Sequence, residues 1–197
     1  ELQFGVNHLG HFALTGLLID NLAAQNNGRV VNVASNAHRQ GRLNFYDLQS
    51  THRYGRMRAY AQSKLANLVF TAELDRRLRR AGNADTLSVA AHPGMAHSNI
   101  SSNLKSESLF DRLIENSLKA LGPYFVQSTL AGAVPTLRAA TDPAAASGDY
   151  YGPNQRMQTR GLAVKVQAKK AAYDVHDGRA LWERSIELTG VDFSSLT

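Results

Sequence analysis

The stretch "RVVNVAS" (residues 29–35) decides the fold class, because it is short, mostly apolar and rich in β-branched side chains. Such a run is typical of a strand that is buried on both faces, as the strands of parallel sheets are. Two further runs predict strands: "TLSVAAHPG" (residues 86–94), which Pro93 terminates, and "GDYYGP" (residues 148–153). We therefore expect a parallel sheet that contains these three strands.

Segments with helical periodicity lie before, between and after these strands. The predicted helices cover residues 2–25, 57–80, 107–121, 127–140 and 177–190. Alternating strands and helices form βαβ units, which place helices on both faces of a parallel sheet. The sequence therefore predicts an α/β fold of the doubly wound kind, in one domain that spans residues 1–197.

The composition excludes several classes of protein. The chain has no cysteine, which excludes disulfides and thiolate chemistry and weakly favours a reducing compartment, so we expect a cytoplasmic location. The net charge is +6, but the basic residues are dispersed, and the densest cluster, "RRLRRAG" (residues 76–82), lies at a predicted helix C-terminus, where cations are favoured. We therefore expect no nucleic-acid partner. No apolar run is long enough to span a membrane.

The strand ends select candidate site residues before any motif is considered. Ligands of open parallel sheets bind beyond the carboxyl ends of the strands. Ser35 follows the first strand, and Pro93 and Gly94 end the second. Tyr60 and Lys64 are four residues apart on the helix between these strands, so both side chains can act on one target. The spacing alone is equally compatible with a core tyrosine beside a surface lysine.

Four motifs, in order along the chain, resemble the short-chain dehydrogenase/reductase family. They are "VNHLGHF" (6–12), "RVVNVAS" (29–35), "YAQSK" (60–64) and "HPGMAHS" (92–98). The long segment between Ser35 and Tyr60, the continuation "SKLAN" (63–67) and the ending "LWERSIELTGV" (181–191) are similar to the retinol-dehydrogenase-like branch. The resemblance implies the C-terminal part of a Rossmann-type sheet.

The resemblance implies a catalytic tetrad of Asn7, Ser35, Tyr60 and Lys64. Reduction of a carbonyl by a nicotinamide hydride requires a proton, which Tyr60 would supply. A free tyrosine has a pKa of about 10, so a phenol active near neutrality needs about 4 kcal/mol of stabilisation of its anion. Lys64 and the cationic oxidised cofactor would provide it. Ser35 would donate to the substrate oxygen, and Asn7 would hold a water molecule that relays protons to Lys64.

Two members of this tetrad have a structural alternative. Asn7 is also compatible with a buried helix asparagine that hydrogen-bonds a neighbour, and Ser35 is compatible with a simple cap at the strand end.

The resemblance also implies an NAD or NADP cofactor. Tyr60 and Lys64 would contact it, Lys64 through the nicotinamide ribose, and so would the loop residues Pro93, Gly94, Met95 and Ser98. Ser98 stands where the family commonly has threonine, and it keeps the hydroxyl. Residues 99–127 would form a lid on the substrate side.

We therefore expect hydride transfer between NAD(P) and a hydrophobic alcohol or ketone. The alternative is a catalytically silent interaction or regulatory protein with the same fold. A Ser35–Lys64 amidase is disfavoured, because no Gly-flanked nucleophile is present.

Three further expectations concern metal, assembly and the start of the chain. His8 and His11 are three residues apart, but no third ligand accompanies them, so we expect no metal. A homodimer through helices 2–25 and 57–80 is a possibility, which loop 36–56 would oppose. No glycine-rich phosphate-binding turn occurs, and Glu1 lies inside a predicted helix, so we expect the N-terminal nucleotide-binding half to be absent from this sequence.

Overall fold

The computed structural model describes residues 2–25, 27–96 and 126–196. They form a four-stranded sheet in the order β1 (Arg29–Val33), β2 (Leu87–Ala91), β3 (Tyr150–Gln155) and β4 (Arg160–Lys165). The first three strands are parallel, and β4 is antiparallel to β3. The α/β class is confirmed, but the sheet is mixed rather than purely parallel. Strand β4 was not predicted from the sequence, because its apolar run is only three residues long and one of its six residues is buried.

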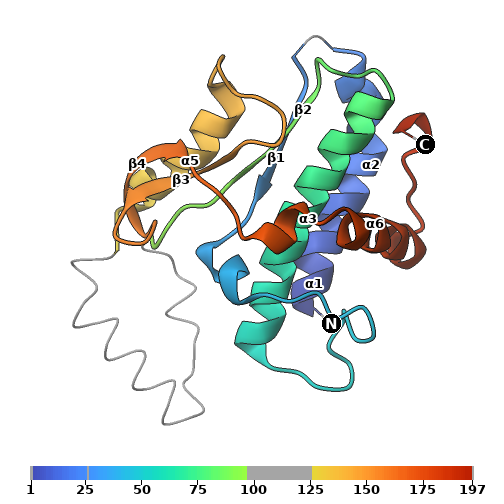
Figure 1. Cartoon of the computed structure of the whole chain (residues 1–197), viewed down its shortest axis with the longest axis horizontal. Helices are drawn as coiled ribbons and strands as arrows, with labels where there is room; N and C mark the ends of the chain where they lie inside the picture. The colour runs from blue at the N-terminus through green and yellow to red at the C-terminus, as the bar shows by residue number, and fades with distance from the viewer. Residues whose placement is uncertain (1, 26, 97–125, 197) are drawn as a thin grey trace.

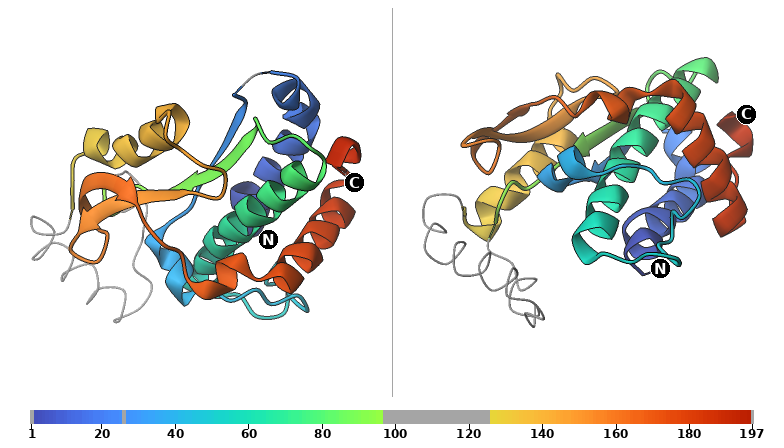
Figure 2. Two further views of the ribbon diagram at one scale, coloured as in Figure 1. Left: turned by 45° about the horizontal axis from the view of Figure 1, so that its top comes forward. Right: turned by 60° about the horizontal axis from the view of Figure 1, so that its bottom comes forward.

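Helices cover both faces of the sheet, as predicted (Figures 1 and 2). On β2, Ala90 packs into the cluster formed with α3 (Arg56–Arg80), whereas Val89 and Ala91 pack against α5 (Thr129–Thr141). Successive small residues of β2 therefore point to opposite faces of the sheet and pack against a helix on each face. β1 has β2 as its one strand neighbour in the described residues, and Val33 is exposed. The expectation that this strand is buried on both faces is wrong at its end.

The N-terminal helix is interrupted by a wider turn. Residues 2–25 were predicted as one helix, and the structure has α1 (Leu2–Phe4), a π-helical turn η1 (Gly5–Leu9) and α2 (Gly10–Ala23) in direct succession. The C-terminal region contains α6 (Val175–Thr189). Short 3-10 turns are η2 (Asn36–Gln40), η3 (Lys170–Tyr173) and η4 (Ser194–Leu196).

Helix α6 packs against α3 and contacts α2, beside which the C-terminus also lies (Figure 1). Aromatic rings hold this packing: Phe12 of α2 and Phe70 of α3 meet Trp182 of α6, with ring centroids 5.3 Å and 5.8 Å from the tryptophan. The homodimer through residues 2–25 and 57–80 stays a prediction.

Two predictions fall largely or wholly outside the described residues. The helix at 107–121 lies there, and so does most of the lid at 99–127. Among the described helices, none combines the length and the apolar character that crossing a bilayer requires.

Candidate active site

Tyr60 and Lys64 lie one turn apart on α3, at the carboxyl end of β1. The Lys64 ammonium donates to the carbonyl oxygen of Val33, the last residue of β1, at 3.1 Å. The same nitrogen lies 5.8 Å from the centre of the Tyr60 ring. Both side chains are half-buried, and burial lowers the pKa of the Lys64 ammonium. The structure therefore brings the predicted pair together at the sheet edge where ligands of such folds bind.

Ser35 follows β1 in extended conformation and begins η2. Its hydroxyl oxygen accepts a hydrogen bond from the backbone N–H of Ala37 at 3.2 Å, so the residue caps this short helix. Ser35 therefore has a capping role, as the alternative interpretation expected, but the element it caps is η2. A hydroxyl that accepts still carries its own hydrogen, which can donate to a ligand. The capping bond fixes the side chain at the strand end without excluding the predicted role.

Asn7 lies in the π-helical turn and faces α3. Its side-chain amide donates to the Ser63 hydroxyl at 3.0 Å, and Ser63 in turn donates to the carbonyl oxygen of Tyr60 at 2.8 Å. Asn7 is thus anchored, through one intermediate side chain, to the backbone of Tyr60. This contact fits the alternative interpretation of Asn7 as an asparagine that hydrogen-bonds a neighbour, while the water relay stays a prediction. Ser63 was not predicted from the sequence.

The loop after β2 is held by backbone contacts. Gly94 has a φ of +66°, and a Cβ there would lie 2.3 Å from the carbonyl oxygen of Thr159. The Met95 N–H donates to the same oxygen at 2.7 Å, while the Met95 carbonyl accepts from the Gln127 N–H at 2.8 Å. The Gln127 amide also donates to the carbonyl of Pro93 at 2.8 Å. Gly94 is therefore required by the approach of the β3–β4 turn. Ser98 lies outside the described residues.

The β3–β4 turn forms a second wall of this edge, which the sequence did not predict. Arg156, Met157 and Gln158 have φ angles of 47°, 58° and 64°, three consecutive left-handed residues that are not glycine. Asn36 donates to the Met157 carbonyl at 2.7 Å, and Arg39 donates to the Gln158 side chain at 3.2 Å. Strained backbone of this kind persists where the surroundings fix it, and here η2 does so.

Three buried rings lie behind the edge. Tyr150 packs between His38 and His92, with ring centroids 5.7 Å and 5.2 Å away. Burial chiefly raises the pKa of the Tyr150 phenol, with smaller contributions from the neighbouring Tyr173 and Tyr60. Tyr60 therefore lies next to a phenol that stays neutral.

The side chains of His8 and His11, which the sequence places three residues apart, do not point to a common site. His8 is fully buried and hydrogen-bonded to Ser185, whereas His11 is exposed. Within the described residues, one group has ligand atoms close enough for an ion: Asp174, His176 and Asp177, at the start of α6. Asp174 already caps this helix, accepting from the Asp177 N–H at 2.9 Å.

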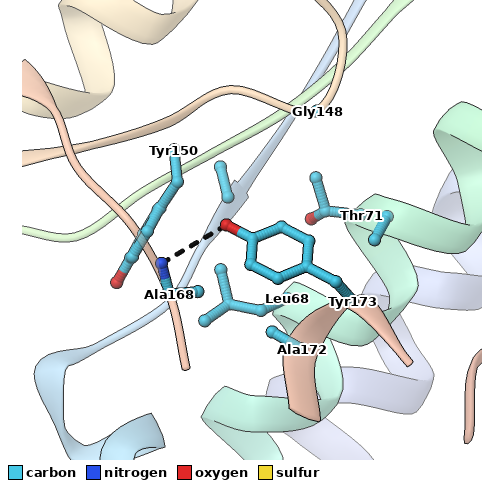
Figure 3. Close-up of a pocket in the computed structure, with 9 residues that line it drawn as sticks. Leu68, Thr71, Gly148, Tyr150, Ala168, Ala172 and Tyr173 are labelled. Carbon is cyan, nitrogen blue, oxygen red and sulfur yellow. Dashed lines mark hydrogen bonds between the residues drawn. The ribbon is translucent and has the colours of Figure 1, made fainter. Parts of the chain in front are cut away.

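The enclosed space behind the sheet is too small for a cofactor. The cavity in Figure 3 is lined by Leu68 and Thr71 of α3 and by Tyr150, and the Tyr173 ring points into it. Its volume is about 10 Å³. The Tyr173 hydroxyl accepts from the Ala168 N–H at 3.3 Å and closes one end. A space of this size holds one water molecule at most.

Comparison with known proteins places the chain in a family. It is 40% identical over 195 residues to mouse retinol dehydrogenase 12 and 39% identical over 203 residues to human retinol dehydrogenase 13. The crystal structure of an uncharacterised protein from Mycobacterium paratuberculosis is 37% identical and superposes with a TM-score of 0.72 over 98% of this chain. No family model matches.

The chain belongs to the short-chain dehydrogenase/reductase family. The resemblance to the retinol-dehydrogenase-like branch is thereby confirmed. This short-chain dehydrogenase/reductase chain spans about half of its relatives: 55% of the mouse protein, 56% of the human protein and 60% of the solved chain.

Proposed function

We propose that the protein is an NAD(P)-dependent oxidoreductase that transfers a hydride between the nicotinamide and a hydrophobic alcohol or carbonyl compound. Membership of the family supports this class of reaction, and the names of the relatives suggest retinol or retinal as the substrate. The observation that carries the proposal is the position of the Lys64 ammonium, hydrogen-bonded to the end of β1 and close to the Tyr60 ring.

Tyr60 is the proposed acid and base. In reduction, its phenol gives a proton to the carbonyl oxygen as negative charge develops there, and in oxidation the phenolate takes the proton of the alcohol. The ammonium of Lys64 stabilises that phenolate, and because both groups are partly withdrawn from water, their attraction is weakened less than at an exposed site. The Ser35 hydroxyl donates to the same substrate oxygen.

The residues at the sheet edge fit a nicotinamide cofactor, though not in every predicted way. An ammonium has three N–H donors, and Lys64 uses one on Val33, so two stay available for ribose hydroxyls. The backbone N–H and carbonyl of Met95 are already paired with Thr159 and Gln127. Met95, Pro93 and Gly94 would therefore contact the cofactor by packing. When bound, the cofactor supplies or accepts the hydride.

Asn7 has a supporting role in this proposal. By holding Ser63, which donates to the Tyr60 carbonyl, it fixes the turn of α3 that carries the acid. The alternative function, a silent interaction protein on the same fold, has no observation in its favour. Titration of the purified protein with NADH or NADPH distinguishes the two functions. An oxidoreductase must bind one of these cofactors, whereas a non-catalytic interaction protein does not need to.

Tyr60→Phe tests the proposal. We expect turnover of retinal with NADPH or NADH to fall by about a thousandfold, because the substitution removes the proton that the reaction needs. Nucleotide binding, measured by titration, should stay within about twofold, since the ring is retained. Tyr46→Phe is the matched control, because Tyr46 is 98% exposed. Full turnover by Tyr60→Phe would remove Tyr60 as the acid.

A further inference from the structure

A line of buried polar side chains connects α6 to the carbonyl that holds Lys64. His8 Nε2 lies 2.9 Å from Ser185 Oγ, and His8 Nδ1 lies 3.4 Å from Asn67 Oδ1. Asn67 Nδ2 donates to the Val33 carbonyl at 3.2 Å, and the same carbonyl accepts from Lys64 at 3.1 Å. His8 and Asn67 have no exposed surface, and Ser185 is 1% exposed. None of these three residues has a role in the reaction proposed above.

The hydrogen bonds fix the Asn67 amide between His8 and β1. Asn67 donates its amide group to the Val33 carbonyl, so its oxygen faces His8 Nδ1 at 3.4 Å. His8 Nε2 lies 2.9 Å from the Ser185 oxygen, and the Ser185 hydroxyl donates to the carbonyl oxygen of Leu181 at 2.7 Å. The aromatic rings of Phe4 and Phe70, with centroids 5.0 Å and 6.0 Å away, enclose the imidazole. The imidazole is therefore fixed between Ser185 of α6 and Asn67 of α3, and Asn67 in turn binds the end of β1.

The two residues that reach α3 from the N-terminal helix lie in the π-helical turn. Asn7 and His8 contact Ser63 and Asn67, which are four residues apart and so lie on one face of α3. The wider turn η1 spans both residues. Turns of this type occur frequently at functional sites.

We propose that His8, Asn67 and Ser185 are positioning residues that aim the Lys64 ammonium at Tyr60 and the cofactor ribose. The inference rests on the catalytic role proposed for Lys64. A carbonyl oxygen has two lone pairs, and Asn67 occupies one of them on Val33, which leaves Lys64 a single direction of approach. His8 and Ser185 hold the Asn67 amide in the orientation that does this. Without the Asn67 donor, the ammonium can rotate onto either lone pair.

The test compares Asn67→Leu with Thr71→Val, two changes inside α3. Thr71 is buried one turn beyond Asn67, where it accepts from Asn32 at 3.0 Å, and it makes no hydrogen bond to Val33. We expect Asn67→Leu to lower kcat for retinal reduction about tenfold while KM stays within about twofold, because misplacement of a catalytic group impairs the transition state rather than binding. Thr71→Val should lower thermal stability comparably and leave kcat unchanged.

A second readout does not depend on activity. Acetic anhydride labelling, followed by mass spectrometry, measures the reactivity of each lysine in the folded protein. We expect Asn67→Leu to raise the labelling rate of Lys64 and to leave that of the exposed Lys170 unchanged. If the wild-type protein has no turnover, the proposed function fails, and the labelling comparison still decides the positioning role.

His8→Asn and His8→Leu keep the inference testable if Asn67→Leu does not fold. Asparagine at position 8 can still donate to Asn67, so it should retain most of kcat, whereas leucine should reproduce the loss. Equal kcat and equal Lys64 labelling in wild type and in folded Asn67→Leu or His8→Leu would overturn the inference.

Discussion

At the scale of single residues, burial controls the charge of three histidines. His8, His38 and His92 have no exposed surface, and each is held by hydrogen bonds rather than by a carboxylate. Burial lowers the pKa of each imidazole from 6.5 to about 4. All three rings are therefore neutral near pH 7.

These histidines make stability dependent on pH. Because the folded pKa lies below the unfolded value, the unfolded chain binds protons first as the pH falls, and the stability present above about pH 6.5 is lost progressively towards pH 4. At pH 5 we expect each histidine to lower the free energy of unfolding by about 2 kcal/mol relative to pH 7.5. Urea denaturation at pH 7.5 and pH 5 measures the loss. Equal free energies at the two pH values would contradict the neutral, buried state of the rings.

At the scale of elements, the β3–β4 hairpin stores backbone strain next to the site. Its three left-handed residues are held by Asn36 and Arg39 of η2, and Thr159 just beyond them receives the Met95 N–H. Each such residue costs of order 1–3 kcal/mol. The hairpin therefore links the segment that follows Ser35 to the loop that follows β2, and it does so at a cost in stability.

Met157→Gly should release part of this strain. The side chain is 83% exposed, and Asn36 binds the Met157 carbonyl, which glycine retains. Glycine adopts a positive φ without steric cost. We therefore expect the free energy of unfolding to increase by about 1 kcal/mol and the midpoint of urea unfolding to rise with it. Leu162→Gly is the control, because Leu162 is 73% exposed on the same hairpin without a positive φ. It should destabilise. Destabilisation by Met157→Gly as well would show that the turn is not strained.

At the scale of the whole molecule, one aromatic cluster joins the two ends of the chain. Phe12 contacts Phe70, Trp182 and Phe193, with ring centroids 5.3 Å, 5.3 Å and 4.8 Å away. The cluster thus includes α2, α3, α6 and the segment before η4. Arg77 covers the Trp182 ring with its guanidinium carbon 4.3 Å from the centroid. The position of α6, and with it that of Ser185, depends on this packing.

Phe12→Ala should destabilise the whole molecule. A truncated buried phenylalanine typically costs about 3–5 kcal/mol. Trp182 is the one tryptophan in the sequence, so its fluorescence reports on the cluster directly, while circular dichroism reports on all helices. We expect both signals to change in one transition at lower urea concentration than in wild type. Separate transitions would show that α6 is not part of the same cooperative unit.

The sequence by itself determined the α/β class, most strands and helices, and the Tyr60–Lys64 pair, because periodicity and a four-residue spacing are local properties that each segment carries alone. Tertiary structure decided what local spacing does not encode. It paired β4 with β3, placed a Thr159 carbonyl against Gly94, and packed α6 over α3. It also turned His8, considered from the sequence as a metal ligand, towards Asn67 and Ser185. These contacts join residues far apart in the chain, so their partners follow from the assembled core and not from any one segment.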